Sequence, residues 1–109
     1  MTQTLSLSDR NDRLRTTFLG GRVLTTEGIR SLNQCDQIRI LHAVQQFNVF
    51  TEDNDPHGEH DFGMIELPDI PTVFWKIDYY SRDMRSGSEN PEDPAVTCYV
   101  LTIYLASEH

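Results

Sequence analysis

The fold of this chain is decided by the stretch AVTCYVLTIYLA at residues 95–106 of a 109-residue sequence. Apolar and β-branched side chains fall on both alternating faces of this stretch, which is typical of a strand that is central in a sheet or covered on both sides. The preceding run TVFWKIDYY, residues 72–80, separates its faces more clearly. We expect its core-facing side chains to be Val73, Trp75, Ile77 and Tyr79, with Tyr80 on the opposite face beside Lys76 and Asp78.

The rest of the chain supplies two helices and further short elements. Ser8, Asp9 and Asp12 precede an apolar pair, which predicts a helix over residues 9–18 that ends at Gly20-Gly21. A second helix is predicted over residues 34–47, with Asn33 as its N-cap. Residues 22–26 and 62–67 are β-prone, and residues 27–32 suggest a turn or one helical turn. This order predicts an α+β fold, an antiparallel meander of three to four strands with two helices packed on one face.

Length and composition point to a single α+β domain over residues 9–109, preceded by an N-terminal tail at residues 1–8. The longest apolar run is far shorter than the roughly 20 residues of a membrane span, and the first residues lack the basic and apolar regions of a secretory leader. We therefore expect a cytoplasmic protein that binds no membrane. Cys35 and Cys98 are expected to be reduced and buried, because two distant cysteines do not make a disulfide framework.

The formal charge of −8 is unevenly distributed. Residues 1–50 hold six arginines against four acids, whereas residues 51–109 hold three bases against thirteen acids. An acidic protein is a poor ligand for nucleic acid by itself, so we expect no direct nucleic-acid binding. Since all but one of the basic residues are arginines, which pair bidentately with carboxylates, we expect these side chains to make internal contacts.

Two acidic loops are the leading candidates for a binding surface. Residues 51–61 contain no hydrophobic side chain, and residues 81–94 are rich in turn-forming residues. Carboxylates spaced on a rigid body can reproduce the charge of a nucleic-acid backbone and compete for a basic groove. A surface that only keeps the protein soluble is the alternative. The expected partner contacts are Glu52, Asp53, Asp55, Glu59, Asp61, Asp83, Glu89, Glu92, Asp93 and Tyr80.

The pentad HGEHD at residues 57–61 could hold a divalent cation such as Zn²⁺ or Mn²⁺ through His57, Glu59, His60 and Asp61. The spacing differs from the helical metalloprotease pattern, and Pro56 and Gly58 favour a loop. The alternative is a turn in which carboxylates cap backbone N–H groups and His60 is hydrogen-bonded at the start of a strand. We expect no cofactor, and a metal only if the first interpretation holds.

Two enzymatic interpretations receive less support. Cys35 beside Asp36, with His42 two turns along the helix, could form a nucleophilic pair, but the start of an apolar helical stripe favours packing. Ribosome-dependent RNase toxins also pack helices on an antiparallel sheet, yet they need basic side chains across it. The sequence leaves enzymatic activity open and favours a non-enzymatic protein.

Several segments together resemble an uncharacterised family of small bacterial proteins found in proteobacterial genomes, plasmids and other mobile elements. The resemblance spans residues 9–108 and is carried by NDRLRTTFLGG at 11–21, DNDPHGEHDFG at 53–63, FWKIDYY at 74–80, DPAVT at 93–97 and VLTI at 100–103. It implies no activity. The mobile-element context it implies favours a role in conflict between such elements and their hosts.

We therefore expect a small acidic protein that inhibits a nucleic-acid-handling host system, of the anti-CRISPR or anti-restriction type, partly by mimicking nucleic-acid charge. Its partner would be a protein or ribonucleoprotein complex with a basic nucleic-acid-binding groove. The alternatives are a metal-binding module or metal-dependent enzyme centred on residues 57–61, and an accessory protein that pairs with a basic partner encoded nearby. The oligomeric state is left open.

Overall fold

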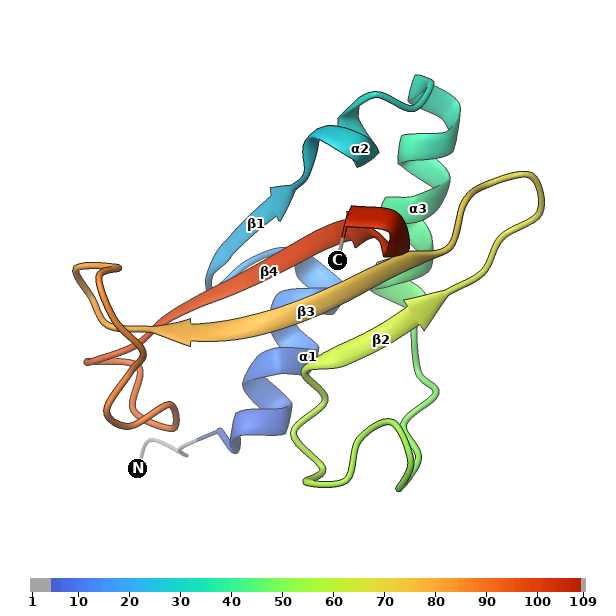
Figure 1. Cartoon of the computed structure of the whole chain (residues 1–109). Helices are drawn as coiled ribbons and strands as arrows, with labels where there is room; N and C mark the ends of the chain where they lie inside the picture. Colours follow the sequence, from blue (N-terminus) through green and yellow to red (C-terminus); the bar gives the residue numbers. More distant parts are fainter. Residues whose placement is uncertain (1–4, 109) are drawn as a thin grey trace.

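The computed structural model describes residues 5–108, which form a four-stranded sheet with helices across one face (Figure 1). The α+β class is confirmed, and no described helix is long and apolar enough to cross a membrane. The elements in chain order are α1 (Leu7–Thr17), β1 (Arg22–Thr25), α2 (Glu27–Arg30), α3 (Gln34–Gln46), β2 (Phe62–Ile65), β3 (Val73–Tyr80), β4 (Cys98–Leu105) and the 3-10 helix η1 (Ala106–Glu108).

The sheet order is β1-β4-β3-β2, so β4 lies inside the sheet as its two apolar faces predict. Strands β2, β3 and β4 form the expected antiparallel meander. The prediction of a strictly antiparallel sheet is wrong at β1, which runs parallel to β4 with Arg22 opposite Val100. A tight turn forces its two strands to be antiparallel, whereas most of the chain separates β1 from β4 and leaves either direction possible.

Helix α1 begins earlier than predicted, because Ser6 is its N-cap and its hydroxyl accepts a hydrogen bond from the Asp9 N–H at 3.2 Å. The helix ends at Thr17, where Phe18 adopts the left-handed conformation with φ 58°, rather than at the glycine pair. Of the predicted tail, residues 1–4 lie outside the described residues, while Leu7 and Ser8 are helical.

Helix α3 has the predicted N-cap, since the Asn33 side chain accepts from the Asp36 N–H at 2.8 Å. Ile40 and Val44, one turn apart, are buried. Ile38 and Cys35 are exposed, so the prediction of a buried Cys35 is wrong. Both point away from the narrow stripe that the helical period assigns to the core.

The core lies between the sheet and the helices. The predicted inward face of β3 is confirmed by the burial of Val73, Trp75 and Ile77. They pack with Leu14 of α1, Ile29 of α2, Ile40 and Val44 of α3, and Leu101 and Ile103 of β4. Cys98 is half-buried at the start of β4, and both cysteines are free as expected. The opposite sheet face, which carries Phe74, is not covered by α1, α2 or α3 (Figure 1).

Candidate functional site

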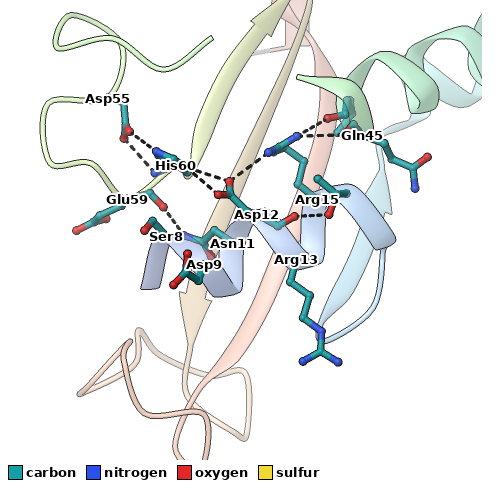
Figure 2. A network of polar contacts seen from close by, with 12 residues as sticks. Ser8, Asp9, Asn11, Asp12, Arg13, Arg15, Gln45, Asp55, Glu59 and His60 are labelled. Carbon is teal, nitrogen blue, oxygen red and sulfur yellow. Dashed lines mark hydrogen bonds and ion pairs between the residues drawn. The ribbon is translucent and has the colours of Figure 1, made fainter. Parts of the chain in front are cut away.

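Segments far apart in the sequence meet in one polar network beside the start of β2 (Figure 2). Its central side chain is Asp12 of α1. One carboxylate oxygen of Asp12, Oδ1, lies 3.1 Å from Nη2 of Arg15 and 3.0 Å from Nδ1 of His60. Asp12 therefore joins helix α1 to the loop that precedes β2.

His60 is held from several directions. Its main-chain N–H donates to Oδ1 of Asp55 at 3.1 Å, and its Nε2 lies 3.5 Å from Oδ2 of the same carboxylate. The imidazole stacks on Phe50, with ring centroids 3.9 Å apart and planes inclined by 2°. These contacts hold His60 in a left-handed conformation with φ 57°, which a side-chain-bearing residue rarely adopts. The structure thus shows the turn that the sequence offered as the alternative to a metal site.

This geometry does not support the interpretation of residues 57–61 as a metal site. Within residues 5–108, no three His, Cys, Asp or Glu side chains lie close enough together to share a metal ion. Both ring nitrogens of His60 face carboxylates, and His57 is exposed. Divalent metal binding at His57, Glu59, His60 and Asp61 stays a prediction of the sequence alone.

Asn11 connects α1 to both the loop and the sheet. The side chain is fully buried, and its Nδ2 donates to the Glu59 carbonyl oxygen at 2.9 Å and to the Tyr79 hydroxyl at 2.8 Å. The Tyr79 hydroxyl in turn donates to Oδ2 of Asp61 at 3.3 Å. Burial raises the pKa of Tyr79, so the phenol stays protonated and serves as this donor.

Arg15 holds the C-terminal end of α3. The buried guanidinium donates from Nη1 to the carbonyl oxygens of Val44 and Gln45, each at 3.2 Å, in the last turn of the helix, where carbonyl groups lack i+4 partners. The Val44 carbonyl oxygen also accepts from the Phe47 N–H at 3.3 Å. It also lies over the rings of Phe50 and Trp75, 5.4 and 5.5 Å from their centroids. The expectation that arginines make internal contacts is confirmed for Arg15.

The close packing beneath this network needs a glycine at the second position of β2. A Cβ on Gly63 would overlap the indole nitrogen of Trp75, whose side chain is fully buried under the strand. Any larger residue would displace Trp75 and with it the surface on which Arg15 lies. The glycine of the DNDPHGEHDFG segment is thus a packing residue.

The predicted contact residues fall into two groups. Asp55 is turned inward, with a side chain only 5% exposed, and Asp61 is tied to Tyr79. Burial and the hydrogen bond with Asp61 raise the pKa of Glu59. The exposed members are Glu52, Asp53, Asp83, Glu89 and Glu92, and the half-buried ones are Glu59, Asp61, Asp93 and Tyr80.

Each acidic loop is tied by a hydrogen bond to one of two neighbouring tyrosines of the sheet. Strand β2 begins opposite Lys76 in the middle of β3, so loop 51–61 leaves the sheet below β2, whereas loop 81–97 joins the end of β3 to the start of β4 (Figure 1). Tyr79 and Tyr99 face each other across β3 and β4. The Tyr79 hydroxyl holds Asp61 in one loop, and the Tyr99 hydroxyl donates to the Pro91 carbonyl oxygen in the other. In the structure the second acidic loop spans residues 81–97, between β3 and β4. Both acidic loops are therefore anchored on the cross-strand pair of Tyr79 and Tyr99.

Sequence reasoning missed the inward roles of Asn11, Asp12 and Arg15. A signal for two of them is present in retrospect: Asn11, Leu14 and Arg15 have helical i, i+3, i+4 spacing, and all three are buried. A polar residue in an apolar stripe needs an internal partner, because burying it without one costs free energy. The partners lie in distant segments, so the spacing alone could not name them.

Comparison with known proteins places the chain in a family without assigning an activity. No curated protein and no solved structure matches the chain. A family model described as "Protein of unknown function (DUF3768)" matches residues 25–108, which include strands β2, β3 and β4, helix α3 and both acidic loops. The chain belongs to the DUF3768 family of proteins of unknown function.

Proposed function

We propose that the protein binds the basic, nucleic-acid-binding groove of a partner protein through its two acidic loops. The observation that carries this proposal is the anchoring of both loops on the cross-strand pair of Tyr79 and Tyr99. Carboxylates on a preorganised surface bind at a smaller entropic cost than carboxylates on mobile loops.

Charge supports the same surface. Loop 51–61 holds five acids and no lysine or arginine, and its Glu52 and Asp53 are exposed. In loop 81–97, hydrogen bonds from the Ser81 hydroxyl and the Arg85 N–H lower the pKa of Asp83, so this carboxylate is ionised at neutral pH. Such a field attracts a basic partner and gives association that slows as salt is added.

The inhibition of a host restriction or CRISPR complex is a narrower form of this proposal. A protein seated in a nucleic-acid-binding groove excludes the nucleic acid, which is sufficient to inhibit an enzyme that acts on it. The choice of such a complex rests only on the mobile-element context that the resemblance implies.

Affinity isolation from cells that encode the protein tests the proposal. The wild-type chain is compared with a Glu52→Lys/Asp53→Lys variant, and the control is Glu27→Lys/Glu66→Lys, an equal change of charge at exposed acids outside the two loops. We expect wild type and control to retain one nucleic-acid-binding protein that the loop variant does not retain. Equal capture by all three would contradict the proposal.

A further inference from the structure

An apolar hollow of about 380 Å³ lies directly beside the more acidic loop. Its lining comes from β2, from Phe74 of β3 and from the segment that follows α3. The lining residues are Phe47, Val49, Asn54, Phe62, Met64 and Phe74. Met64 and Val49 are 49% and 59% exposed, which is unusual for apolar side chains that share one depression.

Asn54 belongs both to the lining of the hollow and to the acidic loop, so the two features adjoin. The Asn54 side chain accepts from the Thr51 N–H at 2.8 Å and donates to the Val49 carbonyl oxygen at 3.0 Å. These bonds fix the turn that carries Glu52 and Asp53 to the wall of the hollow. Two exposed carboxylates are therefore held beside an exposed apolar depression.

We infer that the hollow receives one large apolar side chain of the partner, presented between lysine or arginine residues. Charge complementarity selects this occupant, because loop 51–61 carries five acids and no lysine or arginine. An apolar anchor seated in a pocket supplies affinity, whereas the surrounding charges supply orientation and rate. The inference rests on the proposed function and adds to it an anchor that nucleic acid itself does not have.

The chain offers matched controls. Leu24 is 50% exposed on β1, at the other edge of the sheet, and so is equivalent in exposure to Met64. Ile38 is 59% exposed on α3 and is equivalent to Val49. The test variants are Met64→Ala and Val49→Ala, and the controls are Leu24→Ala and Ile38→Ala. All four truncate an exposed side chain, so folding differences between the pairs are small.

The experiment uses a displayed library of random dodecapeptides, selected against the full-length wild-type chain. Enriched peptides are synthesised, and their dissociation constants are measured for the wild type and for each variant. We expect enriched peptides with a Leu, Ile, Met or Phe flanked by Lys or Arg. Met64→Ala and Val49→Ala should each weaken binding by about tenfold, with Leu24→Ala and Ile38→Ala near wild type.

Other outcomes separate this inference from the proposed function. Basic peptides without an apolar residue, bound equally by Met64→Ala, would overturn the anchor and leave the acidic surface intact. If apolar peptides bind the Glu52→Lys/Asp53→Lys variant as tightly as the wild type, the claim that acidic charge selects the occupant of the hollow is overturned. A failure to enrich peptides would also contradict the inference. Sedimentation that shows a dimer lost in Met64→Ala would identify a second copy as the occupant and overturn it too.

Discussion

Tyr79 and Tyr99 stand opposite each other on β3 and β4, with ring centroids 5.9 Å apart and planes inclined by 81°. Each hydroxyl holds a different acidic loop, since Tyr79 donates to Asp61 and Tyr99 donates to the Pro91 carbonyl. The two loops thus share one rigid support in the sheet. The pair thereby fixes the position of Asp61 in one loop and of Pro91 in the other.

Removing either hydroxyl should loosen the loop that it holds. Tyr79→Phe breaks the hydrogen bonds with Asn11 and Asp61, and we expect a loss of about 1–2 kcal/mol of unfolding free energy. Amide hydrogen exchange should become faster in residues 51–61 for Tyr79→Phe and in residues 88–97 for Tyr99→Phe. Tyr80→Phe is the control, because its hydroxyl makes no hydrogen bond to the described residues. Equal exchange in all three variants would show that the hydroxyls do not anchor the loops.

Arg15 should matter far more for stability than its neighbour Arg13. Arg15→Ala removes two hydrogen bonds to carbonyl groups at the end of α3 and the packing over Phe50 and Trp75. We expect a loss of about 2–3 kcal/mol in urea denaturation. Arg13 is exposed and points away from the network in Figure 2, so Arg13→Ala should change stability by less than about 0.5 kcal/mol. Similar losses in both variants would contradict the assignment.

Asp55 and Asp53 should behave differently although both are acids of the same loop. Asp55→Ala removes the acceptor of the His60 N–H, which supports a left-handed residue, and should cost about 1–2 kcal/mol. Asp53 is exposed, so Asp53→Ala should leave stability unchanged within about 0.5 kcal/mol. Thermal melts of the two variants measure the difference. A stable Asp55→Ala protein would show that the inward carboxylate is not structural.

Glu59 gives the fold a specific pH dependence. Burial and the hydrogen bond with Asp61 raise its pKa in the folded state, so the folded protein holds this proton more tightly than the unfolded chain does. The contribution of Glu59 to stability is therefore largest below the unfolded pKa and falls as the pH rises through the folded pKa.

Glu59→Gln should remove that dependence. We expect the variant to be more stable than the wild type at about pH 7. The two proteins should be equally stable at about pH 3, where the Glu59 side chain is protonated and therefore as uncharged as glutamine. Chemical denaturation at the two pH values measures this difference. A variant that is less stable than wild type at neutral pH would show that the Glu59 carboxylate is favourably paired.

The sequence predicted those parts of the fold that depend on local patterns. The alternation in residues 72–80 identified the buried face of β3, and the two apolar faces of residues 95–106 identified β4 as an inner strand. The parallel pairing of β1 with β4 was not predictable, because no turn joins the two strands. The left-handed Phe18, which ends α1, also goes against residue preference.

The site was less predictable than the fold. The pentad at residues 57–61 has the composition of a metal site. In the structure, however, Nδ1 of His60 contacts the Asp12 carboxylate and Nε2 contacts the Asp55 carboxylate. Asp12 belongs to a helix far away in the sequence, so no spacing rule could pair it with His60. The sequence did identify the acidic residues, but only the structure shows that their two loops are tied to the neighbouring side chains of Tyr79 and Tyr99.

The proposed function predicts that the protein and nucleic acid exclude each other from one groove. The most direct measurement immobilises the partner retained in affinity isolation, saturates it with the protein and adds duplex DNA or RNA of the kind that the partner binds. We predict that bound protein is released in proportion to the nucleic acid taken up, and that Glu52→Lys/Asp53→Lys neither binds nor displaces nucleic acid. A stable ternary complex of partner, protein and nucleic acid would contradict the account.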